Sequence, residues 1–263
     1  MDGGQAERMT LGETRSLPEP RPLPGFGGTA LFLDLDGTLA AIKPRPEDVR
    51  PEPWRTALLH RLGERLGGRL AVISGRTLDE VDRILEGSVQ TVAAVHGLVR
   101  RRADGSLEQA PPDPGLPGAR DRLLALASTI PGLALEDKGL SLALHFRQAP
   151  EAQDEVRAEA RSIAADTGLR LQLGDMVAEL CTPGLDKGTA LKAFMREPPF
   201  KGAAPVFVGD DLTDENGFQA ATGLGGVGLL VGPLRPTHAD MRLESVEAVR
   251  AWLEAGLLQD AQP

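Results

Sequence analysis

Asp34 and Asp36 are the first residues of this sequence whose type and spacing point to chemistry. They follow an apolar run at residues 30–33 and precede Gly37. Such a run indicates a buried parallel strand whose carboxyl end opens onto a site. Residues two apart in a strand lie on the same side, so the two carboxylates would converge and repel each other. A hard cation such as Mg²⁺, which prefers oxygen ligands, would relieve that repulsion.

Three further segments end or begin with side chains that phosphate chemistry uses. The apolar run 70–73 is followed by a serine hydroxyl and an arginine, and the run 205–209 is followed by a dense acidic cluster. Residue 187 is a lysine at the start of a predicted helix. Ligands of doubly wound sheets bind outside the carboxyl ends of the strands, so we expect these groups to meet. They are Ser74, Gly75, Arg76, Lys187, Asp210, Asp211 and Asp214.

This combination of groups suits phosphoryl transfer, in which positioning and charge neutralisation do most of the work. Asp34 would attack phosphorus and form an aspartyl-phosphate. Asp36 would protonate the leaving oxygen and later deprotonate a water molecule. Because the acidic residues outnumber Lys187 and Arg76, bound Mg²⁺ is needed to balance the site.

The order of the elements predicts an α/β protein: a doubly wound parallel-sheet core with an inserted α+β cap. Strands alternate with helices up to a Pro-rich connector, and a different pattern of two helix-strand-strand units follows. We expect a flexible Pro-rich tail, a core in two segments and a cap between them. The ranges are 1–28 for the tail, 29–112 and 183–258 for the core, and 113–182 for the cap.

The predicted cap strand 140–147 has two different faces. Its leucines and Phe146 lie on one side and would pack on helices, whereas the other side is free to meet a ligand. Several ionisable groups could line that free surface together with neighbouring strands. They are Lys138, His145, Arg147 and Glu179.

Composition excludes several classes of function. A net charge of -9 argues against a protein that binds nucleic acid or anionic membranes, and no apolar run reaches the roughly 18 residues of a membrane span. The single cysteine, Cys181, excludes an internal disulfide and a cysteine metal cluster and fits a reducing compartment. We therefore expect a cytoplasmic monomer whose partner is a small-molecule substrate.

The motifs DLDGT, SGR, DKGTAL and GDDLTDE, in this order, resemble the four motifs of the haloacid-dehalogenase (HAD) superfamily of phosphohydrolases. The cap, with EDKGLSLALHFR inside it and PGLDKG at its exit, is similar to that of trehalose-6-phosphate phosphatases. The resemblance covers roughly residues 29 to 250. Against the family pattern, Leu35 replaces an aromatic residue, Asp186 an asparagine and Val95 a polar residue.

The resemblance implies a role for each candidate residue. Asp34 would be the nucleophile and Asp36 the acid and base. The phosphate would be bound by Ser74, Gly75, Arg76 and Lys187. Magnesium would be bound by Asp34, the Asp36 carbonyl and Asp210, with Asp211 and Asp214 in support. The sugar would be bound by Lys138, Arg147 and Glu179, together with His145.

Alternative interpretations remain open from the residues alone. Asp-Gly is a common turn pair, and acidic residues also favour a helix N-terminus through its dipole. The expected function is Mg²⁺-dependent hydrolysis of trehalose 6-phosphate. The alternatives are a phosphatase for sucrose 6-phosphate or a mannosyl phosphate, and a non-catalytic sugar-phosphate sensor with the same fold.

Overall fold

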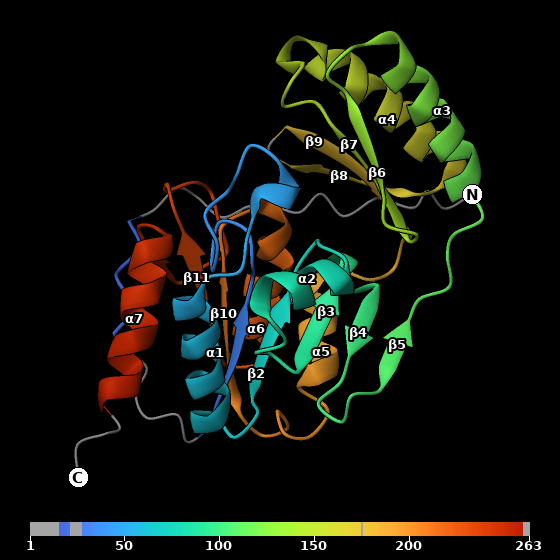
Figure 1. Ribbon diagram of the computed structural model, residues 1–263. Helices are drawn as coiled ribbons and strands as arrows, with labels where there is room; N and C mark the ends of the chain where they lie inside the picture. The colour runs from blue at the N-terminus through green and yellow to red at the C-terminus, as the bar shows by residue number, and fades with distance from the viewer. Residues whose placement is uncertain (1–15, 22–27, 175, 260–263) are drawn as a thin grey trace.

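The computed structural model describes residues 16–21, 28–174 and 176–259. In this part of the chain an eight-stranded sheet forms the core, and a separate four-stranded sheet lies in the cap above it (Figure 1). The core strands, in spatial order, are β12 (Met241–Leu243), β11 (Val227–Val231), β10 (Ala204–Gly209), β1 (Thr29–Leu33), β2 (Leu70–Ile73), β3 (Thr91–Ala94), β4 (Val99–Arg101) and β5 (Leu107–Gln109). The strands from β12 to β3 run parallel, and β4 and β5 continue the sheet antiparallel.

Helices cover both faces of the core sheet, and the alternation along β1 explains why. Leu31 and Leu33 point to one face and pack in a cluster with α1, α2 and α7, whereas Ala30 and Phe32 point to the other and pack with α5 and α6. The helices are α1 (Pro53–Arg65), α2 (Leu78–Leu85), α5 (Lys187–Phe194), α6 (Glu215–Gly223) and α7 (Val246–Gln259).

Three phenylalanines support β1 directly upstream of the candidate nucleophile. The ring centroids of Phe32 and Phe200 are 5.3 Å apart, and those of Phe194 and Phe200 are 5.7 Å apart. The guanidinium of Arg100 lies over the Phe194 ring, 4.9 Å from its centroid. This aromatic cluster fixes the position of the strand whose end carries Asp34.

The cap is an antiparallel sheet covered by two helices on its outer face (Figure 1). Its strand order is β6, β7, β9, β8, and Leu142, Leu144 and Phe146 pack with the helices as the alternation predicted. The opposite face of the sheet is turned toward the core. The cap elements are α3 (Leu116–Thr129), β6 (Ala134–Asp137), β7 (Ser141–His145), α4 (Gln153–Thr167), β8 (Arg170–Gly174) and β9 (Val177–Cys181). The predicted fold class, an α/β core with an inserted α+β cap, is confirmed.

Some local features differ from the sequence interpretation. Strands β4, β5 and β12 were not predicted, because each is three residues long and carries charged or exposed side chains instead of an apolar run. Helix α2 begins with a capping box, because the Thr77 hydroxyl accepts from the Glu80 backbone N–H and the Glu80 carboxylate accepts from the Thr77 backbone N–H. Short 3₁₀ helices are also found at Pro46–Asp48, Val95–Gly97, Pro150–Ala152 and Leu212–Asp214.

Part of the expected tail contacts the core. The Pro18 carbonyl accepts a hydrogen bond from the Arg242 backbone N–H at 3.0 Å, and the Arg21 carbonyl accepts from the Trp252 indole at 2.9 Å. Residues 1–15 and 22–27 lie outside the described residues, so the flexible tail stays a prediction. Among the described residues, no helix is long and apolar enough to cross a membrane.

The aromatic cluster beneath β1 gives a stability prediction. Replacing the fully buried Phe200 with alanine leaves a cavity, and we expect the free energy of unfolding to fall by about 3–5 kcal/mol. Leu107→Ala, at a residue that is 64% exposed, is the control and should change it by less than about 0.5 kcal/mol. Urea denaturation measures both values. Equal losses in the two variants would show that the cluster is not a main source of stability.

Candidate active site

The candidate nucleophile and the acidic loop lie side by side at the carboxyl ends of β1 and β10. These strands pair in parallel, and the Asp34 backbone N–H donates to the Val208 carbonyl at 2.9 Å. Lys187, the first residue of α5, places its Nζ 2.9 Å from Asp34 Oδ1 and 2.6 Å from Asp214 Oδ1. All three side chains are buried, so the ammonium bridges two carboxylates away from bulk water.

Asp214 shapes the acidic loop in addition to binding Lys187. Its second oxygen, Oδ2, accepts from the backbone N–H groups of Asp210 and Asp211 at 3.0 and 2.9 Å. A Cβ at Gly209 would lie 2.3 Å from the Asp214 carboxyl carbon, so only glycine fits there. Both oxygens of Asp214 are therefore engaged by the protein, and it supports the loop from behind.

Three carboxylates offer oxygens that lie within 4.8 Å of one another, those of Asp34, Asp210 and Asp214. Asp210 Oδ1 is buried and has no hydrogen-bond partner among the described residues. Burial raises the pKa of Asp210 to about 9, and the nearby carboxylates of Asp34 and Asp214 contribute to this shift. Burial also raises the pKa of Asp34 to about 7, although Lys187 acts in the opposite direction. A divalent cation would supply the missing partner and the missing positive charge, so the site fits a hard metal ion.

Gly37 allows the acidic loop to approach the end of β1. Its φ is +78°, and a Cβ there would lie 2.0 Å from Asp210 Oδ2. A side chain at this position would therefore be strained and would displace Asp210. The glycine that the sequence suggested for a turn is required for close packing as well.

Asp36 is paired with Arg76 instead of with the other carboxylates. Arg76 Nε donates to Asp36 Oδ2 at 2.7 Å and Nη2 donates to Oδ1 at 2.8 Å, a two-point contact. The same guanidinium donates to the Pro46 carbonyl and to Glu80. In this structure Arg76 orients the candidate acid and base, and its proposed contact with phosphate stays a prediction.

Ser74 and Gly75 follow β2, the neighbour of β1. Ser74 is buried, and its hydroxyl accepts from the Arg76 backbone N–H at 3.3 Å. The Gly75 carbonyl accepts from Lys138 Nζ of the cap at 3.0 Å. The tip of β2 is therefore a meeting point of core and cap.

The register of the cap strands places several polar side chains in one row on the face turned toward the core. Glu136 lies opposite Ala143, Ala143 opposite Glu179, and Glu179 opposite Gln172. Glu179 Oε1 accepts from Ser141 at 2.5 Å and from Lys138 at 3.3 Å. Burial alone would raise the pKa of Glu179, but Lys138, His96 and Ser141 outweigh it and hold that pKa well below its usual range.

The other two candidate sugar ligands lie near one end of this face. His145 Nε2 lies 2.9 Å from Glu136 Oε2, and both side chains are partly buried. Arg147 follows β7 and is exposed. The structure therefore brings Lys138 and Glu179 into one network, joins His145 to it through Glu136, and places Arg147 just beyond β7.

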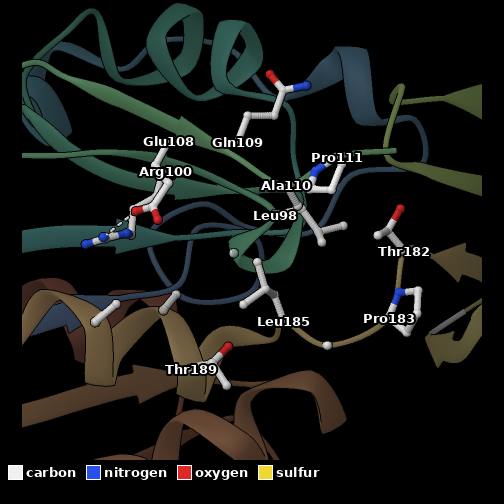
Figure 2. A pocket seen from close by; sticks show the side chains of 14 residues that line it. Leu98, Arg100, Glu108, Gln109, Ala110, Pro111, Thr182, Pro183, Leu185 and Thr189 are labelled. Atoms are coloured by element: carbon white, nitrogen blue, oxygen red, sulfur yellow. Dashed lines mark hydrogen bonds and ion pairs between the residues drawn. The ribbon is translucent and has the colours of Figure 1, made fainter. Parts of the chain in front are cut away.

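A hollow of about 480 Å³ lies away from the carboxylates, at the two crossings between core and cap (Figure 2). Leu98, Ala110 and Pro111 line it on the entry side, and Pro183 and Leu185 line it on the exit side. It contains none of the candidate catalytic residues. This hollow therefore belongs to the crossings between core and cap and not to the candidate active site.

Two residues that were not among the predicted site residues have a clear structural role. Glu215 is completely buried and accepts from Arg235, from Thr237 and from the His238 backbone. Arg235 Nη2 also donates to the carbonyl oxygens of Asp210 and Asp211, at 3.2 and 2.8 Å. Glu215 is the last residue of the motif GDDLTDE, which was a usable signal, but no local pattern marks Arg235.

The contacts of Arg235 predict an effect on cation binding. Arg235→Ala removes two bonds to the backbone that carries Asp210, and we expect divalent-cation affinity to fall roughly tenfold or more, as for other residues that orient metal ligands. Terbium luminescence titration measures the affinity without relying on turnover. Arg242→Ala is the matched control, because Arg242 binds the Gly232 carbonyl on the same side of the core. Identical affinities in the two variants would contradict this role.

Comparisons with known proteins agree with this geometry. The sequence profile of the trehalose-phosphatase family matches residues 32–246. The chain is 42% identical over 231 residues to the trehalose-6-phosphate phosphatase of Escherichia coli (strain K12), covering 86% of this chain and 85% of that protein. It is 35% identical to a probable trehalose-phosphate phosphatase of Sinorhizobium fredii, covering 86% of each.

Solved structures show the same fold. A crystal structure of a trehalose-6-phosphate phosphatase related protein superposes with a TM-score of 0.73 at 26% identity, covering 88% of this chain and 98% of that one. A subclass IIB sugar phosphatase of the HAD superfamily, 12% identical, superposes with a TM-score of 0.60, covering 87% and 99%. From the profile match and the relatives, the chain belongs to the trehalose-phosphatase family, and it shares its fold with a HAD-superfamily sugar phosphatase.

Proposed function

We propose that this enzyme hydrolyses trehalose 6-phosphate to trehalose and phosphate, depends on Mg²⁺ and forms an aspartyl-phosphate on Asp34. The observation that carries the proposal is the buried Lys187 ammonium between Asp34 and Asp214, next to an Asp210 oxygen that has no hydrogen-bond partner in the described part of the chain. Family membership and the names of the two relatives support the substrate.

Asp34 and Asp36 divide the reaction between them in this proposal. An Asp34 oxygen attacks phosphorus, the bond from phosphorus to the sugar oxygen breaks, and Asp36 protonates that leaving oxygen. Asp36 then takes a proton from water, water attacks phosphorus, and the bond to Asp34 breaks to release phosphate. Arg76 keeps Asp36 oriented through its two-point contact.

The charge of the site explains what each remaining group does. Lys187 fixes one oxygen of Asp34 and, with Ser74 and the Gly75 backbone, would bind the phosphoryl oxygens. Mg²⁺, bound by Asp34, Asp210 and the Asp36 carbonyl, would neutralise negative charge on the transferred group. Asp211 and Asp214 support the ligand loop.

The cap would select the sugar. Lys138 and Glu179 form a buried polar network opposite the core tips, and His145 and Arg147 extend this surface. Sugar hydroxyls are both donors and acceptors, and a carboxylate beside an ammonium suits them. We also expect the enzyme to act as a cytoplasmic monomer, in line with its single buried cysteine.

A substrate panel with and without Mg²⁺ tests the proposed function. Phosphate release from trehalose 6-phosphate should exceed that from sucrose 6-phosphate, a mannosyl phosphate and a small aryl phosphate, and chelation should abolish it until Mg²⁺ is restored. Asp34→Asn should lower kcat by more than about 1,000-fold, because its amide cannot attack phosphorus. Asp121→Asn, at an exposed position on α3, is the matched control.

Each outcome of the panel decides one part of the proposal. Comparable kcat/KM values for all sugar phosphates would remove the trehalose assignment. Full activity after chelation would exclude the Mg²⁺ requirement, and full turnover by Asp34→Asn would exclude the aspartyl-phosphate. No release from any substrate by a folded protein would favour a non-catalytic sensor.

The cap residues give a separate prediction. Arg147→Ala removes an exposed cation without emptying the core, so we expect KM for trehalose 6-phosphate to rise roughly tenfold while kcat/KM for the aryl phosphate changes less than twofold. Arg161→Ala, at an exposed position on α4, is the control and should change neither value. A similar loss on both substrates would assign Arg147 to folding and not to recognition.

A further inference from the structure

The loop that follows β3 has an unusual backbone at its first two residues. Val95 has φ +47° and His96 has φ +56°, so two consecutive non-glycine residues are in the left-handed region. For a β-branched residue such as Val95 this is rare, and each such residue costs on the order of 1–3 kcal/mol. Strain of this size persists only where surrounding contacts impose it, and it often marks a functional site.

The contacts that impose this backbone come from the tip of β2. The His96 N–H donates to the Ser74 carbonyl at 2.9 Å, and the Val95 N–H donates to the Arg76 carbonyl at 2.8 Å. A Cβ at Gly75 would lie 2.5 Å from the imidazole of His96, so the ring can pack against this position only because it is a glycine. The loop is thereby joined to the segment proposed to bind phosphate.

The imidazole itself reaches the cap. His96 Nε2 lies 3.0 Å from Glu179 Oε2 and 3.0 Å from the side-chain amide of Gln172, and the His96 residue is 7% exposed. Burial lowers the pKa of His96 despite the opposing Glu179, so the ring is neutral near pH 7 and carries one N–H. A carboxylate is the better acceptor for that N–H, which indicates an Nε2–H donated to Glu179 and leaves Nδ1, 3.3 Å from the Gln172 amide nitrogen, to accept from Gln172.

Glu179 is otherwise bound by its own domain. Oε1 accepts from Lys138 and Ser141, both in the cap, whereas Oε2 is the oxygen that faces His96 of the core. Among the described residues, His96 is the core side chain that contacts Glu179. The second oxygen is therefore oriented only while the cap lies against the core.

We propose that His96 is a positioning residue for substrate specificity: it orients Glu179 in the closed cap and links the sugar surface to the β2 tip. The inference rests on the proposed function, in which Glu179 contacts the sugar. Binding of a sugar to the cap then depends on a side chain of the core, so the sugar is recognised fully only when the cap closes over the phosphate site. A small phosphate ester, which does not reach Glu179, is unaffected.

His96→Asn tests this proposal. Asparagine tolerates the left-handed backbone but is too short to replace the imidazole at Glu179. We expect kcat/KM for trehalose 6-phosphate to fall roughly 10-fold to 100-fold, as for a lost hydrogen bond to a charged group, and kcat/KM for an aryl phosphate to stay within twofold of wild type. His60→Asn, on the exposed side of α1, is the control. If His96→Asn melts more than about 5 °C below wild type, His96→Gly, which carries no strain there, replaces it.

A double-mutant cycle separates positioning from a general structural effect. His96→Asn should add little to the loss caused by Glu179→Gln, because both changes act on one contact. Losses that add, or an equal loss on both substrates, would overturn the role of His96. An unchanged preference for trehalose 6-phosphate in His96→Asn would overturn it as well. If wild type itself shows no such preference, the proposed function fails, which the wild-type measurement reveals before any variant is compared.

Discussion

The bridge from Lys187 to Asp34 and Asp214 is the interaction on which the rest of the site depends. One buried ammonium is shared by two carboxylates, and Asp210 lies beside them with an oxygen that no described residue engages. Burying so many charges is costly unless their contacts are satisfied, so the cluster persists because the fold imposes it. Parallel pairing of β1 and β10, the start of α5 and the hydrogen bonds of Asp214 all serve to assemble it.

The excess of carboxylates over cations in the core also indicates which ligand the core would bind. Burial, together with neighbouring carboxylates, raises the pKa values of Asp34 and Asp210, and a divalent cation would stabilise their charged forms. The cap differs, because Glu179 is balanced by Lys138, Ser141 and His96 and its pKa is lowered. A core with an excess of carboxylates suits a bound cation and the transfer of a phosphoryl group. A cap whose carboxylate is neutralised by its neighbours suits uncharged sugar hydroxyls.

The features of this structure that depend on local sequence pattern were predictable from the sequence. Asp34 and Lys187 were predictable because apolar runs end at polar tips, and parallel sheets bring such tips together. Strand β5 and the partners of Arg76 and Arg235 were not predictable, because a short exposed strand lacks a pattern and long-range partners depend on packing. The expected contact of Arg76 with phosphate stays a prediction, and its pairing with Asp36, 40 positions away, is a contact that only the structure shows. His96 likewise acquires its contact with Glu179 only through the cap, 83 positions away.

Asp34 should carry a phosphoryl group during turnover, and mass spectrometry of the quenched enzyme can detect it. Asp36→Asn should slow release of phosphate from the enzyme, so the protein is mixed with trehalose 6-phosphate and Mg²⁺, quenched in acid and digested. We expect one added phosphoryl group on the peptide that contains Asp34, and none when Mg²⁺ is omitted. An unmodified Asp34 under conditions where the wild type releases phosphate, or a phosphoryl group on another residue, would contradict it.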